Sequence, residues 1–336
     1  MKRRVFLMSG LAACRRERPR LNVYNWSDYV APETVANFER EFGVSVRYGT
    51  YEGNQEMIAK VMSGNSGWDV VFPSADFIGP MHAMGLLQPL RHEWLTNLDA
   101  LDPSFQRPPW DPKLEWGVPY MWGSTGIVFQ KPLALRAWSD LWDARLAGKI
   151  TMLDDPPEVF GACLKRLGHS INSSVEAELR GAQREAIAQK KLLRAYLNAE
   201  VRDQMVAGDV AAAQAWAVTA GQAIAAVPEK LGFVLPEEGF ARFADTAAIL
   251  RESGRAELAH KFIDYLLRPQ VAAEIVKATQ TATANLAAQK LLPDALRENP
   301  VLYPSAETLA RGEWFEALSS NTQKLRDRLW TEIKSA

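Results

Sequence analysis

Three carboxylates that stand close together in the chain have the most evident capacity for chemistry. Asp154, Asp155 and Glu158 could supply the pair of acids that glycoside hydrolysis needs. The sequence does not give their separation, and no second carboxylate cluster accompanies them. Asp155 directly precedes Pro156, so it is equally suited to capping a helix, with Glu158 as its capping-box partner. A carboxylate-based glycosidase is therefore a distant alternative.

Motifs of other enzyme classes are missing from the sequence. It has no Gly-x-Ser-x-Gly elbow, no Gly-rich phosphate loop and no Gly-x-Gly-x-x-Gly fingerprint. Its four histidines are scattered, without the spacing of metal ligands. We therefore predict a protein that is not an enzyme and that uses no metal, nucleotide or other cofactor.

The composition is that of an ordinary globular protein. Of the 336 residues, 47% are hydrophobic and 24% are charged, and the net charge is −1. This length allows two domains with separate cores. A nearly neutral chain lacks the basic excess that nucleic-acid binding requires, so nucleic acid is not an expected partner. The eleven tryptophans fit either packed cores or an aromatic-lined ligand cavity.

The N-terminus has the pattern of a bacterial lipoprotein export signal. Three basic residues at positions 2–4 precede a short apolar stretch, 5–13, that ends in small residues before Cys14. Acylated Cys14 would become the mature N-terminus, and the paired arginines also resemble a twin-arginine signal. We predict a signal peptide, lipobox and tether over 1–20 and a periplasmic, membrane-anchored lipoprotein. A cytosolic chain with a basic start is the alternative.

Strands alternate with helices after this signal, which predicts an α/β fold. Apolar patterns indicate strands at 21–25, 44–48 and 68–73 and helices at 32–42 and 54–63. This order gives a mostly parallel sheet covered by helices. Ligands of such sheets bind beyond the carboxyl ends of the strands, where residues 25–29 and 74–77 lie.

The remainder of the chain predicts a second lobe. The extended, glycine-containing segment 117–129 is the expected first crossing, and 243–249 is the expected return. Further strands are expected at 150–153, 210–216 and 233–235, and further helices at 156–167, 183–198, 201–207 and 255–267. We assign 21–124 with 244–289 to lobe one, and 125–243 with 290–336 to lobe two.

An ordered set of segments resembles the spermidine/putrescine-binding proteins of polyamine ABC importers, in the bacterial extracellular solute-binding protein family 1. The first is Tyr-Asn-Trp-Ser-Asp-Tyr at 24–29; the others lie at 50–54, 68–74, 118–123, 154–160, 265–269, 285–288 and 302–304. The resemblance implies a type II periplasmic binding fold, two α/β lobes that close on a ligand in the cleft between them. It also implies a monomer that serves ABC permease subunits in the membrane. On matching positions the implied ligand-binding residues are Trp26, Ser27, Asp28, Tyr29, Ser74, Asp76, Asp155, Glu158, Trp216, Phe243 and Asp245.

These residue types suit a polyamine, a flexible hydrocarbon that carries several ammonium groups. Each ammonium that leaves water needs a carboxylate or several acceptors, because an unpaired buried charge costs several kcal/mol. Each covered methylene contributes about 0.8 kcal/mol, and an aromatic face attracts a cation by about 0.5–2 kcal/mol. Separated acids supply the counter-charges for the ammonium groups, and aromatic walls between them cover the methylenes.

Each site residue also has a structural interpretation. Asp28 could cap the next helix or stabilise its turn, Trp216 could belong to the core, and a buried Asp245 would need some partner. The sequence also departs from the family at four positions. Thr281 replaces a cleft tyrosine, Asp76 replaces a phenolic or small residue, Thr219 replaces a frequent acid and Thr331 replaces a glutamine. Ligand length therefore stays open.

Other ligands and roles fit the same fold less well. Ferric-ion binders need clustered tyrosines, whereas amino-acid and sugar binders need an arginine or many hydroxyls and amides. A related organic cation such as agmatine, or a sensor that signals to a membrane partner, remains an alternative.

Overall fold

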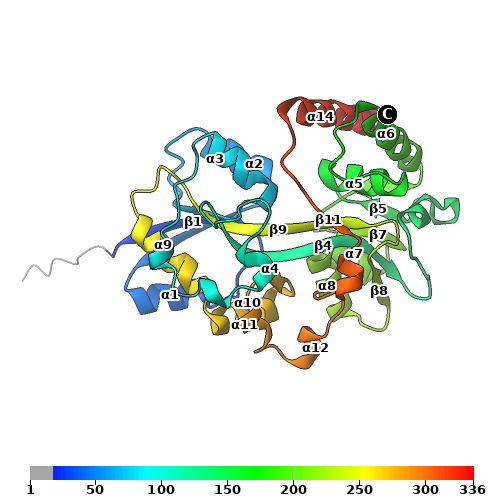
Figure 1. Ribbon diagram of the computed structural model, residues 1–336. Coiled ribbons are helices and arrows are strands. Elements are labelled where there is room, and N and C mark those ends of the chain that lie inside the picture. The colour runs from blue at the N-terminus through cyan, green and yellow to red at the C-terminus, as the bar shows by residue number, and fades with distance from the viewer. Residues whose placement is uncertain (1–17, 199) are drawn as a thin grey trace, which may run out of the picture.

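The computed structural model describes residues 18–198 and 200–336, which fold into two α/β lobes joined by long strands (Figure 1). The predicted signal and Cys14 lie outside the described residues. None of the helices in these two ranges has the length and the apolar composition that a membrane span needs.

Lobe one begins with a parallel three-stranded sheet, as the alternating pattern predicts. Strand β1 (Arg20–Trp26) lies between β2 (Ser45–Tyr51) and β3 (Val70–Val71), and it is parallel to both. The connections are helices α1 (Thr34–Phe42) and α2 (Asn54–Val61). Helix α1 ends at Gly43, whose φ of 65° is a left-handed conformation that glycine adopts without strain. The third strand is shorter than predicted.

Two long antiparallel strands connect the lobes. Strand β4 (Val118–Gln130) pairs with β9 (Phe240–Ile249) from Val118 opposite Ala247 to Ser124 opposite Arg242. Beyond this register β4 pairs with β7 (Ala212–Trp216) and β8 (Leu231–Val234), while β9 pairs with β3. The strand order β2-β1-β3-β9-β4-β7 therefore continues from lobe one into lobe two.

Lobe two continues this order with β5 (Ile150–Met152) and β6 (Leu193–Tyr196). Its helices are α5 (Pro156–Arg166), α6 (Glu176–Lys190), α7 (Val201–Ala207) and α8 (Ala217–Ala226). The single helix predicted over 183–198 is wrong, because α6 begins earlier and 193–196 pairs with β5 as an edge strand. Gly181 lets α6 approach α5: an added Cβ would lie only 3.3 Å from Leu167.

The C-terminal part returns to both lobes. Lobe one receives α9 (Ala256–Leu266), α10 (Pro269–Thr279), β10 (Ala282–Thr283) and α11 (Leu286–Gln289), and after them come α12 (Asp294–Arg297), α13 (Ala306–Leu309), β11 (Gly312–Trp314) and α14 (Ser320–Ser335). Helix α14 packs on α6 and α5 at the top of lobe two (Figure 1). The turn η1 (Ala75–Phe77) and the short helices α3 (Ile78–Ala83) and α4 (Pro103–Gln106) lie between β3 and β4 in the chain.

The hydrophobic cores are separate for the two lobes. The clusters on one side take their members from Leu21 to Trp122 and again from Ala244, whereas those on the other side span Ile127 to Phe240. Leu302 packs in the first group and Leu329 in the second. The lobe borders stay predictions. Because Leu302 packs with the lobe-one core, we propose that the chain passes finally into lobe two after Leu302 and not at residue 290.

Candidate functional site

The predicted site residues lie at or just after strand ends, in the first turn of α5, or on the crossing strand β9. Residues 27–29 follow β1, Ser74 and Asp76 follow β3, Asp155 follows β5 and Trp216 ends β7. Together they line one cavity of about 220 Å³, called here the central cavity: Trp26, Ser27, Asp28, Tyr29, Ser74, Asp76, Asp155, Glu158, Trp216, Phe243 and Asp245. Because the carboxyl ends of the parallel strands in both lobes face the same gap, residues far apart in sequence converge there.

Asp245 is a buried carboxylate held by two hydroxyl donors. The hydroxyl of Tyr29 donates to its Oδ2 at 2.7 Å, and that of Ser74 donates to its Oδ1 at 2.8 Å. The side-chain amide of Asn54 donates in turn to Ser74 Oγ at 3.0 Å. Burial raises the pKa of Asp245 to about 6, whereas the two donors oppose that rise. The carboxylate is therefore oriented by neutral groups and keeps its negative charge uncompensated.

One carboxyl oxygen of Glu158 accepts hydrogen bonds, and the other is vacant, which means here that it has no hydrogen-bond partner in the described part of the chain. Thr125 Oγ1 donates to Oε1 at 2.8 Å, and the indole of Trp216 donates to the same oxygen at 2.9 Å. The other oxygen, Oε2, is buried and has no partner in the described part of the chain. The residue is only 4% exposed. A buried acceptor left unpaired destabilises the protein by about 1–3 kcal/mol, so this oxygen is suited to a donor that comes with a ligand.

Two more acids lie near Glu158 in the central cavity. Burial raises the pKa of Asp76 to about 7, with a further rise from the charges of Asp155 and Asp245. Burial also raises the pKa values of Asp155 and Glu158, each helped by a neighbouring carboxylate. Arg202 is the one basic side chain in this lining among residues 18–198 and 200–336. The cavity therefore favours a cationic occupant.

Aromatic rings form the walls between these acids. The Trp26 indole donates to Phe72 O at 2.7 Å, which fixes its plane beside Tyr29 at a centroid separation of 6.4 Å. Phe243 lies against Gly123 of β4, where a Cβ would stand 2.6 Å from the ring. These contacts hold flat apolar surfaces that can cover methylene groups.

The structure decides among several alternatives for single residues. Asp28 is exposed with φ 54°, and α1 is capped at Glu33 without a side-chain bond, so the helix-cap interpretation of Asp28 is wrong. Asp155 caps α5 by accepting from Glu158 N at 3.2 Å while also lining the cavity. Trp216 is half-buried in the cavity lining, although the core was its alternative.

The four departures from the family pattern lie in different surroundings. Thr219 and Asp76 line the central cavity. Thr281 is buried outside that lining and donates to Thr279 O at 3.4 Å. Thr331 is on α14, where its hydroxyl donates to Asp327 O.

Sequence reasoning missed part of this lining. The additional residues are Glu52, Gly53, Asn54, Gln55, Phe77, Pro157, Asn198, Arg202, Val218, Thr219, Gln222 and Phe315. Asn54 could have been found, because it ends one of the segments that carry the resemblance. Arg202 and Phe315 carry no comparable signal, since only the packing of α7 and of the segment after β11 brings them to the cavity.

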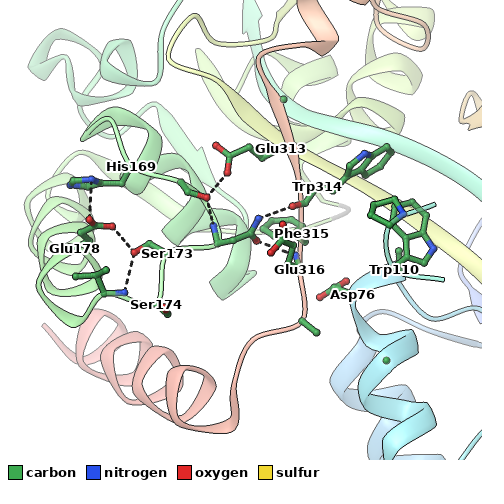
Figure 2. Close-up of a pocket in the computed structure, with 18 of the residues that line it drawn as sticks. Asp76, Trp110, His169, Ser173, Ser174, Glu178, Glu313, Trp314, Phe315 and Glu316 are labelled. Carbon is green, nitrogen blue, oxygen red and sulfur yellow. Dashed lines mark hydrogen bonds and ion pairs between the residues drawn. The ribbon is translucent and has the colours of Figure 1, made fainter. Parts of the chain in front are cut away.

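A second cavity of about 1150 Å³ adjoins the first and shares Asp76 and Phe315 with it. Figure 2 shows Trp110 and Trp314 on one side of this second cavity and His169 and Glu178 on the other. Asn172 holds the strand that crosses it, donating to Trp314 O at 2.8 Å and accepting from Glu316 N at 3.0 Å. Trp110 and Trp314 therefore belong to the lining of this second cavity. In the described ranges no group of three or more His, Cys, Asp or Glu side chains is placed so that it could hold a metal ion.

Two lobes around an acidic, aromatic-walled cavity define a two-lobed ligand-binding protein. The sequence matches bacterial extracellular solute-binding proteins over residues 66–311, and the chain belongs to that family.

Known relatives extend this similarity over nearly the whole chain. The putrescine-binding periplasmic protein PotF of Escherichia coli (strain K12) is 33% identical, over 95% of this chain and 92% of that protein. The structure of the spermidine/putrescine ABC transporter substrate-binding protein PotD from Streptococcus pneumoniae superimposes with a TM-score of 0.83 at 28% identity, covering 94% and 99% of the two chains. The Tp0655 (TpPotD) lipoprotein of Treponema pallidum gives 0.83 at 29% identity, with the same coverage.

Proposed function

We propose that this protein is the substrate-binding subunit of an ABC importer, that it captures putrescine, spermidine or a similar polyamine outside the cytoplasm, and that it delivers the ligand to a membrane permease. The observation that carries the proposal is the vacant Oε2 of Glu158 in a cavity that also contains Asp76, Asp155 and Asp245. An ammonium group supplies the donor and the positive charge that this oxygen lacks. The names of the relatives support the same ligand class.

The geometry suggests how the ligand is held. Asp245, oriented by Tyr29 and Ser74, accepts one ammonium from the lobe-one side. Glu158, oriented by Thr125 and Trp216, accepts another from the lobe-two side. The methylenes between them lie against Trp26, Phe243 and the other rings. A ligand bound in this way joins the two lobes, and the permease then recognises the closed form.

Titration calorimetry on the purified chain tests this function. The panel is putrescine, spermidine, spermine, agmatine, arginine and glutamate. We expect heat from the polyamines and none from glutamate, because the six carboxylates that line the cavity repel an anion. Binding of glutamate alone, or of no member of the panel, would overturn the proposed ligand class.

We also propose that Cys14 carries a lipid anchor and that the protein acts as a monomer. The basic, apolar and small residues before Cys14 support the anchor, as does the lipoprotein of Treponema pallidum among the similar structures. Labelled palmitate should attach to the full chain in bacteria and not to the Cys14→Ala variant. Light scattering from the chain without residues 1–17 should give the mass of one copy.

A further inference from the structure

The central cavity is lined by carboxylates from both lobes. Asp76 belongs to η1, directly after β3 of lobe one, whereas Asp155 and Glu158 stand at the N-terminal end of α5 in lobe two. All three line the same cavity, and Asp76 also lines the second cavity. Movement of one lobe toward the other therefore brings like charges together.

The other charged and titratable groups do not neutralise this arrangement. The central cavity also contains Asp28, Tyr29, Glu52, Arg202 and Asp245. On the second cavity Asp76 is accompanied by His169, Glu178, Glu313 and Glu316. Among the described residues that line the two cavities, Arg202 is the one permanent cation, and Lys165, outside both linings, pairs with Glu313.

Like charges that leave water together raise the free energy of the closed form. Each ionised carboxylate loses hydration on burial, and a neighbouring carboxylate repels it in a medium of low dielectric constant. Two agents remove this cost: a bound cation that lies between the acids, or protons that neutralise them. A neutral solute of the same shape does neither, so it cannot stabilise closure to the same extent.

We infer that Asp76 is a specificity-determining residue that makes closure of the two lobes depend on a bound cation, through its repulsion of Asp155 and Glu158. The inference rests on the proposed function for the identity of that cation, a polyamine. It gives Asp76 a role distinct from that of Asp245, whose oxygens are both held by donors from its own lobe.

Two observations support this role. Oε2 of Glu158 has no partner in the described chain, and the two groups that donate to Oε1, Thr125 and Trp216, are neutral, so no described cation separates this carboxyl group from Asp76. The pKa of Asp76 rises first through burial and then through the charge of Asp155, and the pKa of Glu158 is raised in part by Asp76. The acids of the two lobes therefore influence each other electrostatically.

Solution X-ray scattering of the ligand-free protein tests the inference at about pH 7.5 and about pH 5.5. We compare the wild type with Asp76→Asn, which removes the charge and keeps the shape. The matched control is Glu257→Gln, which removes one charge from α9 outside both cavities.

The wild type should have a larger radius of gyration at the higher pH than at the lower pH. Asp76→Asn should raise the compact fraction at the higher pH by about twofold or more and should weaken the pH dependence. Glu257→Gln should behave as the wild type. Scattering profiles of Asp76→Asn that match the wild type at both pH values would overturn the inference.

A variant on the opposite lobe guards against a folding artefact. Asp155→Asn retains a side-chain acceptor for the cap of α5 and should produce the same shift toward the compact form. Because both variants remove one member of the same repulsion, their effects should be less than additive in the double variant. Full additivity would contradict the inference. None of these scattering measurements uses a ligand. Their failure would overturn the inference about Asp76 without affecting the proposal of polyamine binding. A failure of the calorimetry would not affect the scattering test.

Discussion

The Tyr29 hydroxyl donates a hydrogen bond of 2.7 Å to Asp245 Oδ2, although 216 positions separate the two residues in the chain. The turn after β1 and the crossing strand β9 are thereby connected inside lobe one. Desolvation raises the pKa of Tyr29 well above its ordinary value, and the charge of Asp245 raises it further, so the phenol remains a donor. This bond orients the acid before a ligand arrives.

Replacing Asp245 with asparagine should weaken polyamine binding by about 1 kcal/mol or more, because a desolvated ammonium loses its counter-charge. Calorimetry with putrescine and spermidine measures the change. Tyr29→Phe is the matched control, since it removes an orienting donor and leaves the charge; its loss should be smaller. Unchanged affinity of Asp245→Asn would remove this residue from the binding site.

Glu158→Gln should lower polyamine affinity by about tenfold, roughly 1.4 kcal/mol. The glutamine oxygen can still accept from Thr125 and Trp216, but an amide nitrogen replaces the vacant oxygen and opposes an ammonium donor. Thermal unfolding without ligand should occur at the same or a higher temperature, because a buried charge is lost. Wild-type affinity in this variant would contradict the proposed role.

The ligand-free protein should become more stable as the pH falls from about 8 to about 6. The pKa values of Asp76 and Asp245 are raised to about 7 and about 6, so the folded form binds more protons than the unfolded form in this range. The contribution of these groups to stability is present at low pH and is lost as the pH rises through those values.

Differential scanning fluorimetry across this range measures the unfolding temperature. Saturating spermidine should reduce or reverse the trend, because a cation then balances the ionised acids. An unfolding temperature that falls steadily on acidification from about pH 8 would refute the expected trend.

Gly123→Ala should displace Phe243, since the added Cβ would stand 2.6 Å from the ring. Overpacking of this kind costs about 1–3 kcal/mol, and we expect both a lower unfolding temperature and weaker polyamine binding. Gly254→Ala is the matched control, because nothing lies within 4 Å of its added Cβ. Equal effects of the two substitutions would show that the contact with Phe243 is unimportant.

The fold was largely predictable because local patterns express it. The strands around Val23, Val46 and Val71 and the helix that carries Phe38 lie where alternation and helical spacing put them. The error over 183–198 has a local cause as well. The edge strand at 193–196 is short and only partly buried, so its pattern is weak.

Sequence alone determined the lobe-forming order of strands and helices and the eleven candidate site residues, because residue type, spacing and family resemblance can be read without coordinates. Tertiary structure decided which oxygen of Glu158 is vacant, that Asp76 borders two cavities, and that Arg202 and Phe315 reach the ligand cavity. These features depend on burial and on contacts between distant segments, and the free energy of a charge follows from its surroundings in space. No local pattern in the chain encodes them.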